Sequence, residues 1–341
     1  MKSYRVAIVG ATGLIGQEFI KVLEQRNFPL ADLRLYASDR SAGKKVFVGH
    51  KQVEVKETEN NSFKEVDIAF FSAGAEVSRY FAPIAVQSGA VVVDNSPMFR
   101  MSPSVPLVVP EVNAEDIKGH QGIIANPNCT TVQMVIALNP LHKVNPIKRI
   151  IVSTYQSVSG MGSPAIEELT LQTKQVLEGQ SAAPHVFPHQ IAFNLLPEID
   201  VFLDNGYSKE EWNMAEEARK IMHALDMLVS ATCVRVPVII GHSEAVNVEF
   251  SHPVTVDEAR NILAKAPGVR ILDDASISLY PQPWTAAGTD DVYVGRLRKD
   301  ESYPNGLVMW IVADNVHRGV ALNVVQIAEE LIKRDLLKPR R

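Results

Sequence analysis

Cys129 is the residue in this chain best suited to nucleophilic chemistry, and its neighbours predict where it lies. Residues 123–125 are typical of a buried strand end, Asn126-Pro127 is a turn signal, and Asn128 is a favourable N-cap for the apolar, helix-like run that follows. Cys129 is then expected in the first turn of a helix, where free backbone N–H groups and the helix dipole favour the thiolate, the form that attacks carbonyls and acyl phosphates. An unpaired cysteine is equally often a small buried hydrophobe, and position alone does not separate the two interpretations.

Three polar residues further along the chain are candidate partners for this cysteine. Gln156 stands at a predicted strand end before the glycine-rich residues 157–162, where its amide can donate to a carbonyl oxygen; a turn glutamine with no role is the alternative. Arg235 lies within an apolar strand, so its guanidinium needs a carboxylate from the protein or from a substrate. His242 follows a glycine between two predicted strands, but catalytic Cys and His residues meet in the fold, and spacing does not show that this one reaches Cys129.

The first third of the chain has the pattern of a dinucleotide-binding fold. An apolar strand is predicted over residues 5–9, followed by a Gly10-x-x-Gly13-x-x-Gly16 turn and a helical pattern through Leu23. Gly10 permits the tight turn, Gly13 lets the backbone approach a pyrophosphate, and Gly16 allows close helix–strand packing. A structural turn without a ligand is the alternative, but the strand–glycine–helix context favours a cofactor.

The end of the second predicted strand, residues 33–37, bears on which cofactor is bound. Ser38, Arg40 and Ser41 follow it and favour a ribose 2′-phosphate, whereas Asp39 favours a free 2′-hydroxyl. The sequence therefore predicts NADP rather than NAD.

Further alternation of strands and helices predicts a doubly wound parallel sheet. Strands are expected over residues 66–71 and 90–94, with a helix over 76–87 between them, and a strand-like run at 107–109. Ligands bind at the carboxyl ends of such strands, so the Ser72 turn is a predicted second cofactor loop. Arg100 leaves another strand end, where it can hold a phosphate with two hydrogen bonds, although a single loop arginine is more often solvated.

The remainder of the chain predicts a second, mixed α/β region. Strands are expected over residues 150–154, 245–250, 290–296 and 307–312, and helices over residues 164–177, after the N-cap Ser208, and over residues 320–334, with residues 182–199 irregular. His185 and His189 are four apart, but Pro188 lies between them and no third ligand is near, so no metal site is predicted.

Length, net charge and cysteine count restrict the kinds of protein to which this chain can belong. The 341 residues suffice for two domains, the net charge is −5, and there is no long basic run, which argues against a nucleic-acid partner. Two cysteines give no disulfide framework, and no signal peptide or membrane-spanning stretch is recognised, so we expect a cytoplasmic protein. The basic residues at the C-terminus are expected to serve helix termination and solubility; they are Lys333, Arg334, Lys338, Arg340 and Arg341.

Taken in order, these motifs resemble the aspartate-β-semialdehyde dehydrogenase family over essentially the whole chain. The matching segments are residues 10–13 with 38–43, 126–130, 155–162, 204–212, 234–236 with 241–243, and 314–327. The resemblance implies NADPH-dependent reductive dephosphorylation of L-aspartyl-4-phosphate to L-aspartate 4-semialdehyde through a cysteine thioester, in lysine, methionine, threonine and diaminopimelate biosynthesis. It also implies a Rossmann-type NADP-binding domain of residues 1–128 with 322–341, an α+β catalytic and dimerisation domain of residues 129–321, and a homodimer or tetramer.

The resemblance assigns roles to residues at matching positions. Cys129 is implied as the nucleophile, His242 as the general acid/base and Gln156 as the residue that orients the acyl group. Substrate contacts are implied for Arg100, Asn128, Glu210 and Arg235: phosphate for the first two, the α-ammonium for Glu210 and the α-carboxylate for Arg235. The implied cofactor-binding residues are Gly10, Thr12, Gly13, Leu14, Ile15, Ser38, Arg40, Ser41, Ser72, Gly160 and Asn315.

Two positions depart from the family pattern. Asn213 replaces a lysine that helps to hold phosphate, and His317-Arg318-Gly319 replaces an Arg-Lys-Gly sequence. The first change removes a positive charge from the phosphate site. It therefore leaves open a related acyl-thioester reductase of the malonyl-CoA reductase kind, and a non-catalytic NADP-binding paralogue is a further alternative.

Overall fold

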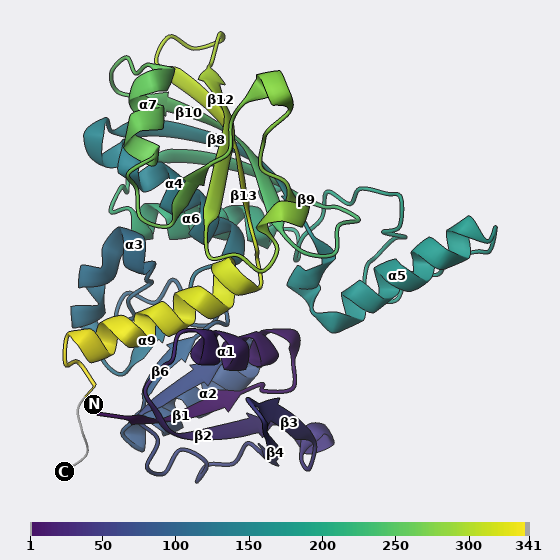
Figure 1. The fold of residues 1–341 in the computed structure, drawn as a ribbon, viewed down its shortest axis with the longest axis vertical. Helices are drawn as coiled ribbons and strands as arrows, with labels where there is room; N and C mark the ends of the chain where they lie inside the picture. Colours follow the sequence, from purple (N-terminus) through teal and green to yellow (C-terminus); the bar gives the residue numbers. More distant parts are fainter. Residues whose placement is uncertain (1, 338–341) are drawn as a thin grey trace. The chain divides into compact units, whose positions relative to one another are not determined.

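The computed structural model describes residues 2–337, which divide into two compact units, each with its own β-sheet (Figure 1). The first unit comprises the chain up to Asn128 together with the segment from Val320 onward, and the second comprises Cys129–Gly319. Among the described residues, no helix combines the length and apolar character needed to cross a bilayer.

The first unit contains a seven-stranded sheet in the order β3-β4-β2-β1-β5-β6-β7. All neighbours pair in parallel except β3 and β4, which form an antiparallel edge. The strands are β1 (Tyr4–Val9), β2 (Leu30–Ala37), β3 (Lys45–Val48), β4 (Lys51–Glu57), β5 (Ile68–Phe71), β6 (Val91–Asp94) and β7 (Ile123–Ala125). The helical segments are α1 (Leu14–Gln25), η1 (Asp39–Ser41), α2 (Ala75–Gln87), α3 (Pro110–Asn113) and η2 (Ala114–Gly119).

Helices cover both faces of this sheet, which confirms the predicted doubly wound class. Phe19 of α1 packs against Phe70 of β5, with ring centroids 5.4 Å apart. Ala69 and Phe71, the neighbours of Phe70, point to the opposite face because side chains alternate along a strand. There they share a buried cluster with Ala82 and Ala85 of α2.

Two local features of this unit differ from the sequence analysis. The β3–β4 pair was not predicted, since its alternating lysines and glutamates are exposed at a sheet edge and resemble a solvated loop. Residues 107–109 were predicted as strand-like, but only Leu107 makes an isolated bridge, to Ala125, and α3 begins at Pro110.

The second unit contains a six-stranded mixed sheet in the order β11-β12-β13-β10-β8-β9. The strands are β8 (Ile147–Gln156), β9 (Leu228–Arg235), β10 (His242–Phe250), β11 (Val269–Ile271), β12 (Val292–Lys299) and β13 (Gly306–Ala313). The helical segments are α4 (Cys129–Val144), η3 (Val158–Met161), α5 (Ser163–Leu177), α6 (Lys209–Ile221), α7 (Val256–Leu263), η4 (Ala275–Ile277) and α8 (Pro283–Ala286).

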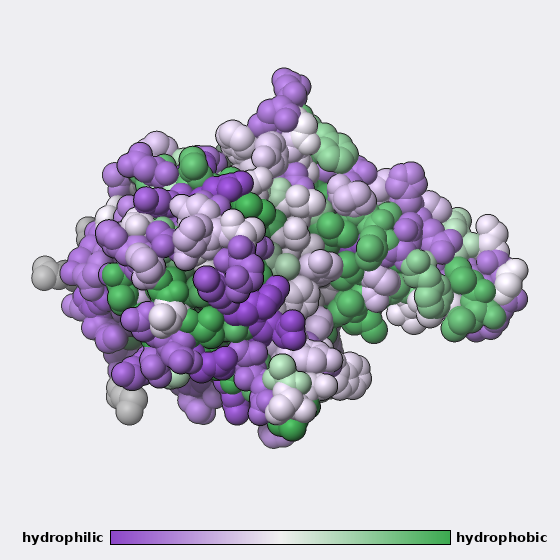
Figure 2. Space-filling view, turned by 90° about the horizontal axis from the view of Figure 1, so that it is seen from above, coloured by the Kyte–Doolittle hydropathy of each residue, from purple (hydrophilic) through white to green (hydrophobic). Residues whose placement is uncertain are grey.

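One face of this sheet is covered by α4, α6 and α7, and the other is largely open. Along β8, Ile150, Val152 and Thr154 are buried, whereas Ile151 and Tyr155 are each 39% exposed. The helix α5 extends away from the sheet (Figure 1), and hydrophobic side chains gather on the projecting part that it forms (Figure 2). The second unit therefore carries two apolar surfaces that its own helices do not cover.

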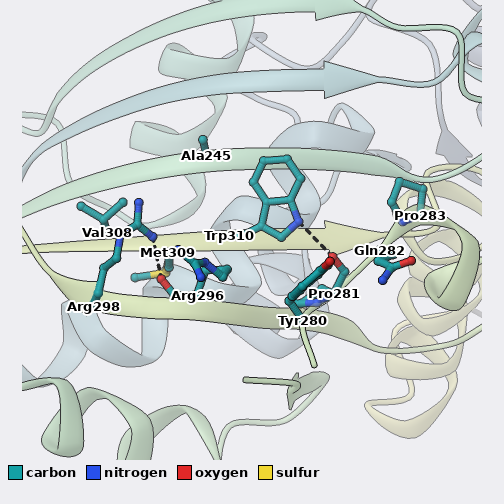
Figure 3. A pocket seen from close by; sticks show the side chains of 10 residues that line it. All are labelled: Ala245, Tyr280, Pro281, Gln282, Pro283, Arg296, Arg298, Val308, Met309 and Trp310. Carbon is teal, nitrogen blue, oxygen red and sulfur yellow. Dashed lines mark hydrogen bonds between the residues drawn. The ribbon is translucent and has the colours of Figure 1, made fainter. Parts of the chain in front are cut away.

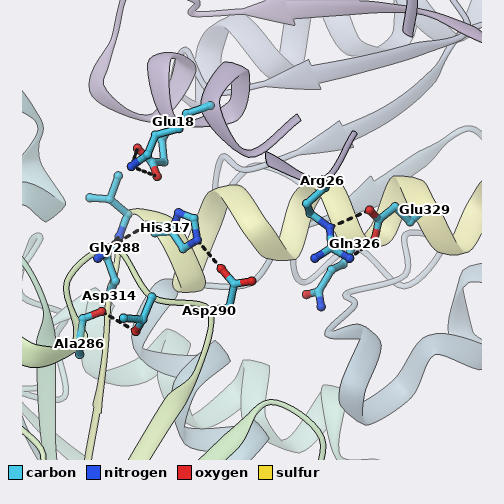
Figure 4. A network of polar contacts seen from close by, with 12 residues as sticks. Glu18, Arg26, Ala286, Gly288, Asp290, Asp314, His317, Gln326 and Glu329 are labelled. Atoms are coloured by element: carbon cyan, nitrogen blue, oxygen red, sulfur yellow. Dashed lines mark hydrogen bonds and ion pairs between the residues drawn. The ribbon is translucent and has the colours of Figure 1, made fainter. Parts of the chain in front are cut away.

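The chain returns to the first unit through η5 (His317–Leu322), a π-helical segment, and α9 (Asn323–Lys333). A single α-helix was predicted from residue 320, so its first turn is wound more widely than expected. In α9, Glu329 pairs at 2.7 Å with Arg26, the C-cap residue of α1 (Figure 4). Arg334 pairs with Glu330 and Glu115, while Lys338, Arg340 and Arg341 of the predicted basic tail lie outside the described residues.

Candidate active site

Strand direction brings three predicted site residues to one edge of the second sheet. β8 and β9 are parallel, with Gln156 opposite Arg235 at their carboxyl ends. β10 runs antiparallel to β8 and begins at His242, so its first residue lies at the same edge. Three residues that are distant in sequence therefore converge because of pairing register, which sequence spacing could not show.

Cys129 is the first residue of α4, as the sequence predicted. This helix is apolar all round and buried along most of its length, which fits its position between the sheet and the helices α6 and α7. Cys129 itself is partly exposed. A Cβ placed on Gly319 would lie 2.7 Å from the Cys129 Cβ, so the chain passes tightly against the cysteine there. The thiol thus combines a helix N-terminus with access from solvent.

Gln156 is bonded to Glu210, another predicted substrate residue. Its Nε2 donates to Glu210 Oε1 at 2.9 Å, and its Oε1 accepts from Thr154 Oγ1 at 2.9 Å. Glu210 lies in the first turn of α6, whose N-cap Ser208 forms a capping box with Glu211, as the sequence indicated for this N-cap. Such caps typically contribute about 1 kcal/mol and fix where the helix starts. The cap therefore positions the Glu210 carboxylate.

Arg235 is 3% exposed and donates from Nη1 to the Ser157 carbonyl oxygen at 2.8 Å. Within the described chain no ion pair of this guanidinium is found, although Glu210 and Cys129 both influence it electrostatically. Burial lowers the pKa of Arg235, and these two groups oppose that effect. A buried cation of this kind favours an anionic ligand, and a carboxylate matches its donor geometry.

His242 is fully buried, and its two ring nitrogens differ in their hydrogen-bond partners. Nδ1 accepts from the Ser157 backbone N–H at 3.0 Å and lies 3.1 Å from Ser157 Oγ. Within residues 2–337, Nε2 has no hydrogen-bond partner. Burial and the charge of Arg235 lower the pKa of His242 well below its ordinary value, and the Gly241 carbonyl opposes them. A Cβ on Gly160 would lie 3.6 Å from Nε2 and 2.9 Å from Arg235 Nη1, so only glycine fits there without displacing these groups.

Ser157, Ser159 and Asn315 hold this histidine, and the first two were not singled out from sequence. Asn315 is 2% exposed, and its Oδ1 accepts from Ser157 Oγ, Ser159 Oγ and the Gly241 N–H. The Ser-Val-Ser-Gly sequence after a strand end was the available signal. Asn315 was predicted to contact the cofactor, and the structure gives its side chain this internal role.

The glycine turn of the first unit has the geometry of a nucleotide cradle. Gly10 has φ +93°, and a Cβ there would lie 2.4 Å from the Ser72 carbonyl oxygen, so the two predicted cofactor loops touch. α1 follows with Gly13 at its N-cap and no side chain capping it. Thr12, Leu14 and Ile15 are half-buried around this helix start, where backbone N–H groups favour a phosphate.

The segment after β2 carries the residues predicted for the 2′-phosphate. Ser38 and Arg40 are exposed and Ser41 is half-buried, at the C-terminal end of a strand that pairs with β1. Asp39 is exposed beside them. Two hydroxyls and a guanidinium in this place suit a phosphate group.

Comparison with known proteins identifies the family. Residues 5–120 match the model of the semialdehyde dehydrogenase NAD binding domain, and residues 138–318 match that of the semialdehyde dehydrogenase dimerisation domain. The aspartate-semialdehyde dehydrogenase of Aquifex aeolicus is 54% identical over 98% of this chain and 99% of its own. The chain belongs to the aspartate-semialdehyde dehydrogenase family.

Solved structures of this family agree with the fold. Aspartate semialdehyde dehydrogenase II of Vibrio cholerae, complexed with ASA, is 46% identical and superposes with a TM-score of 0.95, covering 98% of this chain and 99% of that one. The Candida albicans aspartate semialdehyde dehydrogenase with NADP is 26% identical, with a TM-score of 0.77 and coverage of 98% and 100%.

Two further residues predicted for aspartate-semialdehyde dehydrogenase phosphate binding belong to the first unit, Arg100 between β6 and α3 and Asn128 after β7. Arg100 is 8% exposed and donates from Nε to the Asn126 carbonyl and from Nη2 to the Asn95 carbonyl, both at 3.0 Å. The guanidinium is thus oriented by backbone acceptors rather than solvated. Asn128 is half-buried and immediately precedes the helix that Cys129 begins, which is the N-cap position predicted from sequence.

The two departures from the aspartate-semialdehyde dehydrogenase pattern have different structural settings. Asn213 is half-buried on α6, three residues after Glu210, where helix geometry places the two on one face. His317 is 2% exposed, and its Nε2 lies 2.7 Å from Asp290 Oδ1 (Figure 4). The neighbouring Asp314 accepts from the N–H groups of Val316 and His317. The His317-Arg318-Gly319 sequence therefore lies in a hydrogen-bonded segment whose Gly319 packs closely against Cys129.

Proposed function

We propose that this protein catalyses the NADPH-dependent reductive dephosphorylation of L-aspartyl-4-phosphate to L-aspartate 4-semialdehyde. The observation that carries the proposal is the convergence of Gln156, Arg235 and His242 at one edge of the second sheet. Cys129 is the first residue of the same unit. The Vibrio cholerae relative complexed with ASA supports the substrate.

Cys129 Sγ attacks the C4 acyl carbon and expels phosphate, which leaves an acyl thioester. When bound, NADPH supplies the hydride that reduces this thioester. The tetrahedral species then releases the semialdehyde and regenerates the thiolate, and the expelled phosphate takes up a proton from solvent. The same steps in reverse convert aldehyde and phosphate to acyl phosphate.

Each site residue is assigned to a different group of the substrate. Arg235 holds the α-carboxylate, Glu210 the α-ammonium, and Gln156 the acyl oxygen, while His242 acts on that oxygen through Nε2. Arg100 and Asn128 hold the phosphate. The burial of Arg235 without an ion pair among the described residues supports its assignment to a carboxylate.

NADP is the proposed cofactor of the first unit, which we take as the nucleotide-binding domain. The pyrophosphate fits the uncapped start of α1, where Gly10, Thr12, Gly13, Leu14 and Ile15 present their backbone. The 2′-phosphate is assigned to Ser38, Arg40 and Ser41, with Ser72 on the adjoining loop; Gly160 and Asn315 are assigned to the nicotinamide side. The Candida albicans relative with NADP supports this choice over NAD.

The open face of the second sheet is proposed as the homodimer interface, with a tetramer as the alternative. A hollow of about 480 Å³ lies on it beside Trp310, whose Nε1 donates to the Pro281 carbonyl at 3.0 Å (Figure 3). The Tyr155 ring packs tilted against the same ring, with centroids 5.3 Å apart, and Tyr155 is 39% exposed. The match to a dimerisation domain supports a second copy on this face. A cytoplasmic role in lysine, methionine, threonine and diaminopimelate biosynthesis follows from the proposed reaction.

Asn213 favours a second candidate, a reductase that takes its acyl group from a coenzyme A thioester and needs no phosphate site. The test incubates the protein with aspartate semialdehyde, NADP⁺ and phosphate and follows NADPH, then repeats with arsenate, with NAD⁺, and with malonyl-CoA plus NADPH. We expect turnover with phosphate and arsenate. Turnover with malonyl-CoA alone would establish the second candidate, and nucleotide binding without any turnover would establish the non-catalytic paralogue.

A further inference from the structure

The carboxylate of Glu211 joins the first turn of α6 to the strand β9. Its Oε2 accepts from the Ser208 backbone N–H at 2.7 Å, which is part of the capping box of α6. Its Oε1 accepts from the Cys233 backbone N–H at 2.9 Å. A capping box requires only the bond to the N-cap residue, so the bond to Cys233 is an additional link from the helix to the strand.

The bond to Cys233 covers the outer edge of β9. Among the described strands β9 is the last of its sheet and pairs with β8 alone, so the backbone N–H groups on its other side need acceptors from elsewhere. The N–H groups of alternate residues point to the same side of a strand. The Arg235 N–H, two residues beyond Cys233, donates to the Leu196 carbonyl at 2.8 Å. Glu211 and Leu196 therefore hold neighbouring points of one strand edge, and the second point is the backbone of Arg235.

The helix α6 and the strand β9 carry the two residues assigned to the charged groups of an α-amino acid. Glu210, beside Glu211 in the first turn of α6, is 8% exposed, and Arg235 is 3% exposed. Burial lowers the pKa of Arg235, and the nearby Glu210 carboxylate opposes that effect. The ammonium and carboxylate of the substrate are joined to one carbon atom, so their separation is fixed. The separation of Glu210 from Arg235 must match it.

The far end of α6 is attached to the same strand independently of Glu211. Arg219, in the last turn of the helix, donates from Nε to the Met227 carbonyl at 2.7 Å, immediately before β9 begins at Leu228. The helix packs along the strand between these two ends. Loss of the Glu211 carboxylate therefore releases the helix start that carries Glu210, while the other end of α6 stays attached.

We propose that Glu211 is a positioning residue that sets the separation of Glu210 from Arg235, and that it thereby makes the site selective for substrates with an ammonium and a carboxylate on the same carbon. The inference rests on the proposed function, from which it takes the ligands of Glu210 and Arg235. Both oxygens of Glu211 already accept from backbone N–H groups, so this residue acts through Glu210 and not on the substrate.

Two substrates that differ only in the ammonium group measure this selectivity. Aspartate semialdehyde carries the group and succinate semialdehyde lacks it, and we define selectivity as the ratio of their kcat/KM values. We expect a ratio of about a hundredfold or more in the parent protein, because the analogue leaves the buried Glu210 carboxylate without a cation. In Glu211→Ala the ratio should fall about tenfold, chiefly through a higher KM for aspartate semialdehyde. An unchanged ratio would overturn the proposal, since a variant that merely loses folded protein lowers kcat equally for both substrates.

Glu258 provides a matched control on another helix. It forms the capping box of α7 with Thr255, whose N–H donates to Glu258 Oε2 at 2.8 Å, just as Glu211 forms that of α6 with Ser208. Glu258→Ala should leave the selectivity at the value of the parent protein. The same loss of selectivity in Glu258→Ala and Glu211→Ala would contradict the proposal, because it would follow from losing any helix cap.

A conservative substitution keeps the test valid if Glu211→Ala does not fold. Glu211→Gln keeps the size of the side chain and one acceptor oxygen, but its amide NH₂ then faces one of the two backbone N–H groups. We expect a selectivity between those of the parent protein and Glu211→Ala, with an unchanged circular dichroism spectrum. A selectivity equal to that of the parent protein in Glu211→Gln would overturn the proposal.

A binding measurement separates this inference from the proposed reaction. L-2-Aminobutyrate and butyrate are inert counterparts of the two substrates, with a methyl group in place of the aldehyde, and ligand-observed NMR titration of the full-length protein with NADP⁺ gives their Kd values. We expect the parent protein to bind L-2-aminobutyrate about tenfold or more tightly than butyrate, and Glu211→Ala to lose most of this preference. A parent protein without the preference would contradict the assignment of Glu210 in the proposed function. A preference that survives in Glu211→Ala would overturn the role of Glu211 alone.

Discussion

Gln156 and Glu210 are hydrogen-bonded to each other, Nε2 to Oε1 at 2.9 Å. The two residues assigned to the acyl oxygen and the α-ammonium are thus coupled before substrate arrives, one from the end of β8 and one from the first turn of α6. Substrate binding must share or exchange this bond. Glu210 consequently serves both as a ligand and as the group that aims the Gln156 amide.

Removing only the charge of Glu210 should weaken substrate binding. Glu210→Gln keeps an acceptor for Gln156 but loses attraction for an ammonium group, so we expect KM for aspartate semialdehyde to rise about tenfold with a smaller change in kcat. Steady-state kinetics check this, with Glu216→Gln, partly exposed on the same helix, as the control. A KM equal to that of the parent protein would remove Glu210 from the ammonium site.

Arg235 should not tolerate lysine. Lysine keeps the charge but cannot reproduce two parallel hydrogen bonds to a carboxylate, and it loses the orienting bond to the Ser157 carbonyl. We expect Arg235→Lys to raise KM about tenfold to a hundredfold. Arg270→Lys, at a largely exposed position, is the control and should leave KM unchanged. The assignment fails if the two variants behave alike.

Restoring the missing cation should strengthen phosphate binding. Asn213 shares a helix face with Glu210, and a lysine there can reach toward the same site. We expect Asn213→Lys to lower KM for phosphate about threefold to tenfold, with the gain shrinking at high salt because the pair is partly solvated. No change in KM at low salt would place Asn213 outside the phosphate site.

Glu244 should make stability fall with rising pH. It is 0% exposed on β10, neither carboxyl oxygen has a hydrogen-bond partner among the described residues, and burial raises its pKa well above the usual 4.5. The nearby Gln133 amide, outside hydrogen-bonding geometry, opposes this shift. The carboxyl stays protonated in the folded state above pH 4.5, where the unfolded chain ionises, so the free energy of unfolding decreases by up to about 1.4 kcal/mol per pH unit until the folded pKa is reached.

Glu244→Gln removes this titration while keeping the shape of the side chain. Denaturant unfolding at pH 5 and pH 8 should show that the variant gains stability relative to the parent protein as pH rises. Parallel pH dependence in the two proteins would mean that Glu244 is ionised in the folded state.

Local features of the fold could be predicted from sequence. The start of α4 at Cys129 follows from the Asn-Pro-Asn turn, and Ser208 caps α6 as expected. The glycine turn before α1 has the left-handed Gly10 that a tight turn requires. The start of α7 carried an equally clear signal, the Thr255–Glu258 capping box, which the sequence analysis did not use. These helix starts and turns depend on a few adjacent residues, so the local sequence is sufficient to predict them.

The assembly of the site could not be predicted from the residues alone. His242 meets Ser157, which lies 85 residues away, and Ser157 meets Asn315 at a separation of 158 residues. These contacts depend on the register of β8, β9 and β10, and the decisive group at Ser157 is a backbone N–H that every residue except proline carries. The hydrogen-bond partners of His242 therefore follow from the fold and not from any motif.

The central claim, that the acyl group passes through Cys129, is tested most directly by oxidising aspartate semialdehyde with NADP⁺ in the absence of phosphate and arsenate. We predict a rapid burst of NADPH, about one per Cys129, together with an acyl adduct on that residue by mass spectrometry of the quenched protein, and turnover once phosphate is added. Cys129→Ala should give neither burst nor adduct while still binding NADPH. Sustained turnover by Cys129→Ala, or a parent protein that forms NADPH with no adduct on Cys129, would contradict the account.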